Sequence, residues 1–162
     1  MHFLLLFLTI SGYHSQYLIV QSLYKNALDN ERNTDDLIHF LESQDEYDSF
    51  SFFLGYYGSA FALKAKYAES TIKKYTYSKK ADYFLDTSIE MDPRNLDSRF
   101  LRFTLNAHLP KFLKDQNELI KDSDKFSQLI ELTAENELTE YQKWMLTEFS
   151  KIKQRIIPDW TL

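Results

Sequence analysis

The sequence predicts an all-α fold in which about seven helices form an array of antiparallel hairpins. The chain has only 3 Gly and 3 Pro among 162 residues, and so few turn formers argue against a many-stranded sandwich. Hydrophobic residues make up 44% and charged residues 27% of the chain, as in globular proteins with a substantial core. Apolar residues recur at helical spacing along most of its length. We therefore expect long helices joined by short connections.

The first segment, MHFLLLFLTISGYHSQ, resembles a short secretory signal. An apolar run over residues 3–10 precedes small and polar residues, with a candidate cleavage position near residues 15 and 16. No Lys or Arg precedes the run, and the run is too short to span a bilayer as a helix. We expect residues 1–16 to be a signal peptide, residues 17–162 to form a single all-α domain, and the protein to be periplasmic or extracellular. The alternative is a buried first helix or strand of a cytosolic protein.

A helical hairpin is expected after this segment. Residues 17–29 carry apolar residues at helical spacing, and residues 30–33 form a polar joint. Asn33 or Thr34 can cap a second helix that ends near Ser43. Because the joint is short, the two helices should run antiparallel.

The segment 49–68 should form the central helix. It is apolar almost all round and has no charged residue before Lys64, which is typical of a helix surrounded by others. Small residues lie together on it: Gly55, Gly58, Ser59 and Ala62. Each glycine costs about 1 kcal/mol relative to alanine inside a helix, and close packing of a neighbouring helix would offset that cost. A transmembrane helix is the alternative, although the uncharged stretch is short.

The remaining helices are predicted from caps and proline breaks. Ser70 can cap a helix over residues 71–91, and Pro93 ends that helix. Asn95 can cap a helix over residues 96–108, and Pro110 suits the first turn of the next. That next helix extends to about residue 130, with polar residues at 122–124 that allow one break. Thr139 and Gln142 form a capping box for the last helix, which Pro158 stops.

The fourth and fifth helices resemble one tetratricopeptide repeat. The matching positions of its second helix and exit turn are Ala81, Leu85, Ser88, Ile89, Pro93 and Asn95. The repeat is degenerate, because Glu69 stands where the repeat has glycine and no second copy occurs at that period. The resemblance implies a tetratricopeptide-like array in which the other helices serve as neighbours and caps.

A wider resemblance covers residues 55–113. The segments GYYGSAFALKAKYA, RFLRF and LPKFL resemble those of a group of uncharacterised, exported proteins typical of the Bacteroidota. The chain departs from that group at Thr71, where the group has proline. The resemblance implies export and a helical fold, and it implies no activity.

Two arginines on helix 96–108 are the sharpest candidates for a binding site. Arg99, Arg102 and Asn106 fall on one strip of the helix, between two apolar faces. Guanidinium groups bind carboxylates and phosphates in a bidentate manner, which favours a small-anion site. The alternative is an internal network of salt bridges, because charges near a core are normally paired. The expected partners in such a network are Asp82, Asp86 and Glu69.

A basic tract with interleaved tyrosines runs from Lys64 to Lys80. Such a pattern occurs in nucleic-acid stacking platforms and also in ordinary solvated helix faces. The net charge of −5 argues against a general nucleic-acid binder. The segment 29–48 is rich in Asp and Glu, so the two tracts could face each other or give the molecule a polarised surface.

Catalytic, metal and cofactor motifs are absent from the sequence. The lack of Cys excludes disulfides, thiolate catalysis and zinc–sulfur sites. The sequence has no Gly-rich phosphate loop, serine elbow or HExxH motif. His39 and Glu42 lie three residues apart on a predicted helix, but one such pair does not make a metal-binding motif. We expect no metal and no cofactor.

The leading functional prediction is a non-catalytic exported protein that binds a protein or peptide through a helical groove. Tyr56, Tyr57, Tyr67 and the strip of Arg99, Arg102 and Asn106 are the predicted contacts. The alternative is a small-anion binder or a helical enzyme built on the two arginines. We expect no nucleic-acid partner and no stable membrane insertion after signal removal. The groove is inferred from the analogy of fold.

Overall fold

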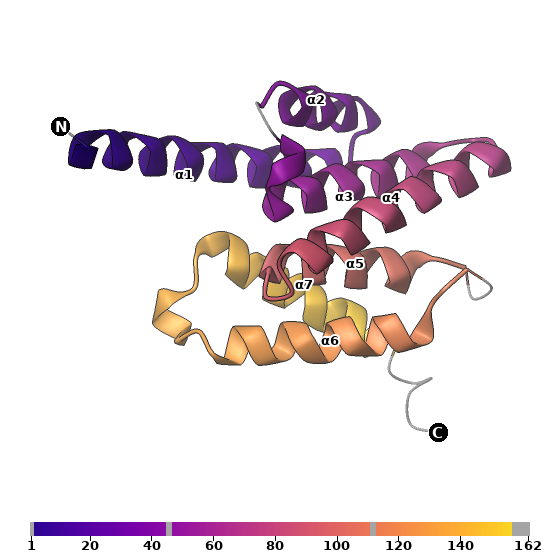
Figure 1. The fold of residues 1–162 in the computed structure, drawn as a ribbon. Helices are drawn as coiled ribbons and strands as arrows, with labels where there is room; N and C mark the ends of the chain where they lie inside the picture. The colour runs from indigo at the N-terminus through magenta and orange to yellow at the C-terminus, as the bar shows by residue number, and fades with distance from the viewer. Residues whose placement is uncertain (1, 45–46, 111–112, 157–162) are drawn as a thin grey trace.

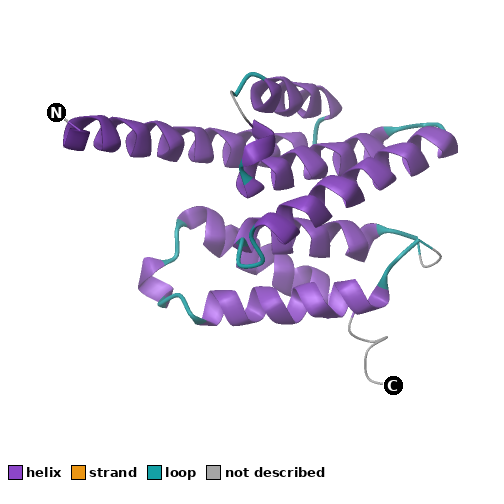
Figure 2. Cartoon of the chain, in the orientation of Figure 1, coloured by secondary structure: helices purple, strands orange, loops and turns teal. Residues whose placement is uncertain are grey.

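The computed structural model describes residues 2–44, 47–110 and 113–156, with side chains from Ser15 onward apart from Glu135. Within these residues the chain is all-helical and has no strand, so the predicted all-α array of about seven helices is confirmed (Figures 1 and 2). The α-helices are α1 (His2–Ala27), α2 (Glu31–Glu42), α3 (Ser51–Tyr67), α4 (Thr71–Met91), α5 (Leu96–His108), α6 (Gln116–Glu131) and α7 (Glu140–Ile156). Two short 3-10 helices, η1 (Tyr47–Ser49) and η2 (Glu135–Glu137), join them.

The helices lie in two layers with α3 at the centre. Figure 1 shows α1 to α4 in one layer and α5 to α7 in the other. Helix α3 contacts α1, α2, α4 and α5, and most of its residues are buried, including Tyr56, Ala60 and Phe61. This central position was predicted from the nearly uncharged sequence of α3.

Two glycines allow the neighbours of α3 to approach it closely. A β-carbon at position 58 would lie 3.0 Å from the carbonyl oxygen of Ala81 and 3.1 Å from the amide nitrogen of Leu85, both backbone atoms of α4. A β-carbon at position 55 would lie 2.5 Å from the Ser98 Oγ of α5. The close packing that the small residues predicted is therefore confirmed.

Two of the predicted helix boundaries are wrong, and one possible break is not found. Helix α2 begins at Glu31, because Asn30 rather than Asn33 or Thr34 is its cap and accepts a hydrogen bond from the Arg32 amide at 3.0 Å. Helix α6 begins at Gln116, not near Pro110, because the Asp115 carboxylate accepts hydrogen bonds from the first free amides of the helix. No break occurs at residues 122–124, where α6 continues.

Other predicted caps are confirmed. Asn95 accepts a hydrogen bond from the Ser98 amide at 3.0 Å. In the capping box, the Thr139 amide donates to Gln142 Oε1 at 2.9 Å and the Gln142 amide donates to Thr139 Oγ1 at 3.2 Å. Ser70 stands at the N-cap position of α4 but makes no capping hydrogen bond with its side chain.

The predicted signal peptide coincides with the first turns of α1. Met1 and the side chains of residues 2–14 lie outside the described part of the structure, and cleavage near residues 15 and 16 stays a prediction. The early turns of α1 extend beyond the other helices (Figure 1). Among the residues that the structure describes, no helix has the length and apolar character needed to cross a bilayer.

Candidate functional site

The two predicted arginines are buried and bind the same carboxylate. Arg99 and Arg102 are each 5% exposed. Arg99 Nη1 donates to Asp122 Oδ1 at 2.7 Å. Arg102 grips Asp122 in a bidentate manner, with Nε 2.6 Å from Oδ2 and Nη2 2.9 Å from Oδ1. One fully buried carboxylate of α6 thus accepts hydrogen bonds from both guanidinium groups of α5.

The remaining guanidinium donors also have partners within the protein. Arg99 Nε and Nη2 donate to the carbonyl oxygen of Pro93 at 3.3 and 3.2 Å. Arg102 Nη1 donates to Asp86 Oδ1 at 2.5 Å and to Glu118 Oε1 at 3.2 Å. We call Arg99, Arg102 and Asp122 with these neighbours the arginine cluster; it joins α4, α5 and α6.

The arginine cluster shifts the pKa of its members in ways that follow from its geometry. Burial lowers the pKa of Arg102, but its hydrogen bonds to Asp122 and the charge of that carboxylate more than offset the burial and raise the pKa above its usual value. Burial raises the pKa of Glu118, and the charge of Arg102 only partly counteracts this. Arg102 therefore stays charged while Glu118 holds its proton more readily than a free carboxyl.

Three carboxylates lie close together at the outer edge of the arginine cluster. Oxygen atoms of Asp82, Asp86 and Glu118 lie within 4.8 Å of one another. Oxygen ligands at this spacing suit a hard cation. However, Arg102 Nη1 already bonds to Asp86 and Glu118 and supplies the positive charge that a cation would bring.

The predicted salt-bridge partners were partly found. Asp86 does pair with Arg102, whereas Asp82 forms an ion pair with Lys79 at 3.5 Å and Glu69 has no ion pair with either arginine among the described residues. The main partner, Asp122, was missed. Its signal was its position: it lies between Leu119 and Phe126 on the buried face of α6, where a charged residue needs a partner.

Asn106, the third member of the predicted strip, lies apart from this network. It is 2% exposed, and its Nδ2 has no hydrogen-bond partner within the described residues. It is therefore a buried polar group and not a contact point at the surface.

A second buried cluster centres on Asp97, in the first turn of α5. The carboxylate accepts hydrogen bonds from the Tyr17 hydroxyl at 2.7 Å, the Tyr56 hydroxyl at 2.6 Å and Gln21 Nε2 at 3.2 Å. The Tyr56 hydroxyl also lies 2.8 Å from that of Tyr141. We call these residues the Asp97 cluster. It joins α1, α3, α5 and α7 at the centre of the molecule.

The Asp97 cluster holds a carboxylate without a counterion among the described residues. Asp97 is 3% exposed, and burial raises the pKa of its carboxyl, although the hydrogen bonds from Tyr56, Tyr17 and Gln21 lower it in part. Burial and the nearby Asp97 charge raise the pKa of Tyr56 well above its usual value. The Tyr56 hydroxyl therefore remains a protonated donor.

The three predicted contact tyrosines lie in different surroundings. Tyr56 is fully buried in the Asp97 cluster. Tyr67 donates to the carbonyl oxygen of Leu28 at 2.8 Å and so fastens the end of α1 to α3. Tyr57 donates to Glu42 Oε1 at 2.8 Å, and its ring reaches a surface hollow beside α4.

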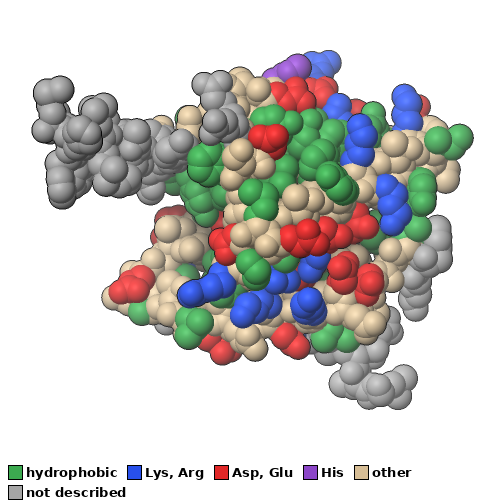
Figure 3. Space-filling view, in the orientation of Figure 1, with side chains coloured by type: hydrophobic (Ala, Val, Ile, Leu, Met, Phe, Trp, Pro, Cys, Tyr) green, Lys and Arg blue, Asp and Glu red, His purple; other side chains and the backbone are tan. Residues whose placement is uncertain are grey.

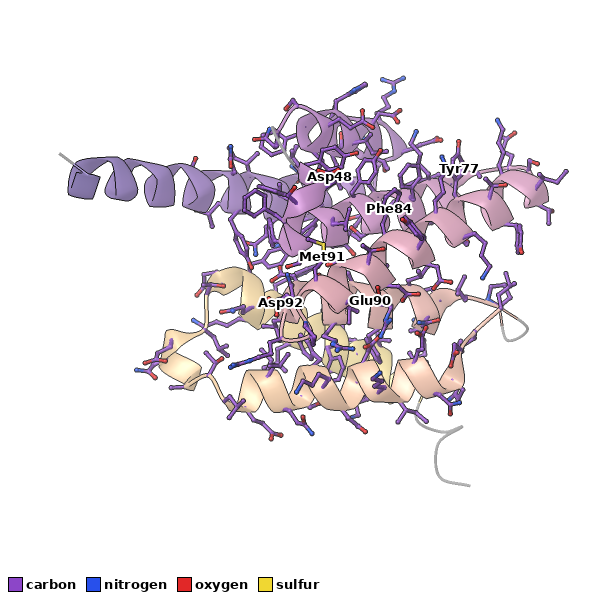
Figure 4. All side chains as sticks on the ribbon, viewed as in Figure 1. Asp48, Tyr77, Phe84, Glu90, Met91 and Asp92 are labelled. Carbon is purple, nitrogen blue, oxygen red and sulfur yellow. The ribbon has the colours of Figure 1, made fainter. Side chains whose placement is uncertain are left out.

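That hollow, which we call the α3–α4 groove, has a volume of about 530 Å³. The rings of Tyr57 and Phe61 from α3 and Phe84 from α4 form its floor, with centroids 4.9 Å apart for Tyr57–Phe84 and 5.9 Å for Phe61–Phe84. Tyr75 and Tyr83 of α4 also line it and are 52% and 65% exposed. Phe84 lies on the α3 side of α4 in Figure 4.

The α3–α4 groove combines an apolar floor with lysine side chains. Lys79 and Lys80 line it, and Lys80 Nζ lies 5.1 Å from the ring centroid of Phe61, in a cation–π contact. Figure 3 shows hydrophobic side chains gathered on this face, with Lys or Arg side chains beside them. Aromatic residues are enriched at protein interfaces and lysine is depleted there, so the aromatic floor, and not the lysines, favours a protein-binding surface.

A second hollow, of about 610 Å³, lies along α6. Arg99 reaches it, and its other lining residues are Asn117, Ile120, Lys121, Asp124, Lys125 and Gln128. This lining is mostly polar and of mixed charge, without the aromatic floor of the α3–α4 groove.

The chain was compared with protein-family models, with curated proteins and with solved structures, and none of them matches it. The geometry of its own residues is therefore what a functional proposal has to rest on.

Proposed function

We propose that this protein is a non-catalytic, tetratricopeptide-like helical array that binds a segment of another protein in the α3–α4 groove. The proposal rests on Tyr75 and Tyr83, two tyrosines that are more than half exposed and lie beside the aromatic floor of the groove. Tyrosine is enriched among the residues that dominate binding energy at protein interfaces. Of the contacts expected from the sequence, only Tyr57 belongs to this groove.

The small-anion or enzymatic alternative has weaker support. The donors of Arg99 and Arg102 that would meet a carboxylate or phosphate already bond to Asp122, Asp86, Glu118 and the Pro93 carbonyl. An incoming anion would have to displace a fully buried carboxylate that both arginines hold. Such an exchange would leave Asp122 as an unpaired buried charge, which is costly.

Selection from a random peptide display library against the full chain tests the groove. Peptides selected on the unchanged protein should bind the Tyr83→Ala variant at least about tenfold more weakly, because large aromatic contacts contribute most to such interfaces. Leu132→Ala is the control, since Leu132 is 78% exposed and does not line the groove. If every selected peptide binds Tyr83→Ala as well as it binds the unchanged protein, the groove is not the binding site.

We also propose that the protein acts outside the cytoplasm, on the strength of the signal-like residues 1–16. Mass spectrometry of the protein purified from its own cells measures the mature N-terminus. A chain that begins near residue 16 or 17 is the expected result. An intact Met1 would refute export by this route.

A further inference from the structure

The lysines around the α3–α4 groove have at most one weak ion pair among the described residues. Lys79 has only a 3.5 Å ion pair with the Asp82 side chain, in a setting open to solvent. Lys80 rests on the ring of Phe61, and Lys73 forms no ion pair among the described residues. Because residues 73, 76, 80 and 83 share one face of a helix, Lys73 extends the row of charges along the groove.

The start of α4 adds to the positive potential of the groove. Lys73 and Lys74 lie in its first turn, which has no acidic residue, and Ser70 makes no capping hydrogen bond with its side chain. The N-terminal end of a helix already carries a partial positive charge. Lysines at this end repel the partial positive charge of the helix, and the carboxylate of a bound partner would offset that repulsion.

The other edge of the α3–α4 groove has the opposite charge. Glu42, at the end of α2, accepts the hydrogen bond of Tyr57, and Asp48 of η1 lies on this side of the molecule (Figure 4). These carboxylates would repel an anionic ligand, so an acidic segment would place its charged residues along α4 and away from η1. Charge complementarity of this kind fixes register and partner choice.

We propose that the α3–α4 groove takes an acidic segment of a partner protein. A large apolar side chain of the segment packs on the floor between Tyr75 and Tyr83, and its Asp or Glu residues meet Lys73, Lys79 and Lys80. This inference rests on the proposed function and names the chemistry of its partner. An anionic membrane would also attract these lysines, but Phe61 is only 9% exposed at the floor of a hollow, out of reach of a flat surface.

Three synthetic peptides of equal length test the acidic partner directly. All three carry Phe and Leu at alternating spacings of three and four residues. The other positions are all Glu in the first peptide, all Gln in the second and all Lys in the third. Fluorescence anisotropy with the full chain should show the Glu peptide binding at least about tenfold more tightly than the Gln peptide, and the difference should shrink as salt is added. The Lys peptide should not bind.

Matched variants assign the effect to the groove. Replacing Lys73, Lys79 and Lys80 by Gln should weaken the Glu peptide about tenfold. Replacing the distant exposed residues Lys121, Lys143 and Lys151 by Gln removes the same total charge and should change little. Circular dichroism should be the same for both variants, because all six side chains are at the surface.

Each other outcome overturns the acidic partner in a distinct way. If the Gln peptide binds as tightly as the Glu peptide and Tyr83→Ala still weakens both, the groove function stands and the acidic class is wrong. If none of the three peptides binds, the acidic segment is wrong, and the library selection decides separately on the groove.

Two other occupants have their own readouts. Binding to vesicles with one third phosphatidylserine that depends on the same three lysines, without peptide binding, would reassign the surface to a membrane. Self-association that the Lys73, Lys79 and Lys80 variant abolishes, measured by analytical ultracentrifugation, would identify a second copy of the chain as the occupant. Either result overturns the proposal.

Discussion

The arginine cluster and the Asp97 cluster both include residues of α5, and each buries a carboxylate in a different way. Asp122 is held by two guanidinium groups, so each charge has an opposite charge beside it. Asp97 is held by two tyrosine hydroxyls and one amide group, all of them neutral. The first cluster joins α5 to α4 and α6, and the second joins it to α1, α3 and α7.

The partners of a buried carboxylate determine how it responds to pH. A buried carboxylate beside a guanidinium group has an opposite charge that offsets its loss of hydration. A carboxylate held by neutral donors is stabilised by hydrogen bonds but keeps much of its desolvation penalty, and the raised pKa of Asp97 expresses that penalty. The Asp97 cluster should therefore be the pH-sensitive part of the core.

The largest effect is expected from Asp122→Ala. The change leaves two buried guanidinium groups without their shared partner, and breaking a buried ion pair costs about 3–5 kcal/mol. Urea unfolding followed by circular dichroism measures the loss. Asp124→Asn, two residues away and exposed, is the control. A loss no greater than that of the control would show that the arginine cluster does not stabilise the fold.

A smaller loss is expected from Asp97→Ala. The variant leaves the hydroxyls of Tyr17 and Tyr56 and the amide of Gln21 without their acceptor, and each unsatisfied buried donor costs about 1–3 kcal/mol. The Tyr56 hydroxyl keeps Tyr141 as a partner, and the change also removes the desolvation penalty of the Asp97 carboxylate, so the net loss should be smaller than the sum. Because Tyr17 is half-buried, water can replace part of what it loses. If Asp97→Ala destabilises the protein as much as Asp122→Ala or more, the arginine cluster is not the larger contributor to stability.

The pH dependence of stability gives a second test of the Asp97 cluster. The folded pKa of Asp97 lies above the unfolded value of 3.8, so the folded state binds more protons than the unfolded state between these two values. By linkage, the contribution of the protonated carboxyl is fully present below the unfolded pKa and is lost as pH rises through the folded pKa.

Asp97→Asn removes this titration while keeping a similar shape. In urea unfolding from about pH 3.5 to 7, the stability of the unchanged protein relative to this variant should fall as the pH rises. Asp36→Asn, at an exposed position of α2, is the control for the loss of one carboxylate from the chain. A constant difference between the unchanged protein and Asp97→Asn would mean that the carboxyl titrates alike in both states.

The smallest effect is expected at the rim of the arginine cluster, from Glu118→Gln. The Glu118 side chain is 31% exposed and Arg102 retains Asp122 and Asp86, so the loss should stay below about 1 kcal/mol. Added salt should reduce it further. A loss comparable to that of Asp122→Ala would show that the rim, and not Asp122, holds Arg102.

Sequence periodicity was sufficient for the helices and for the central place of α3, because both depend on local apolar patterning. It also identified the caps at Asn95 and Thr139, whose partners are three residues away. Asp115 was missed as a cap, since Pro110 offered an earlier start. Where two residues could each start a helix, the packing of the helix in the fold decides between them.

The Asp97 cluster could not be read from the sequence. In sequence, Tyr17 lies 80 residues and Tyr56 41 residues from Asp97, and Tyr141 lies 85 residues from Tyr56. An acidic residue in the first turn of a helix is ordinary because it suits the helix dipole, so Asp97 itself gave no signal. Asp122 was hidden for the opposite reason, because its charge on an apolar face suggested a break in the helix.

The hydroxyl of Tyr17 bears on the proposed cleavage of the N-terminal segment. A peptidase that cut near residues 15 and 16 would leave Tyr17 at or next to the new chain end, with its hydrogen bond to Asp97 available. Trimming by even two further residues would delete that bond and expose the Phe52 ring on which Tyr17 stacks at 3.7 Å. The folded body thus sets how far its own N-terminus can be shortened before the core begins to open.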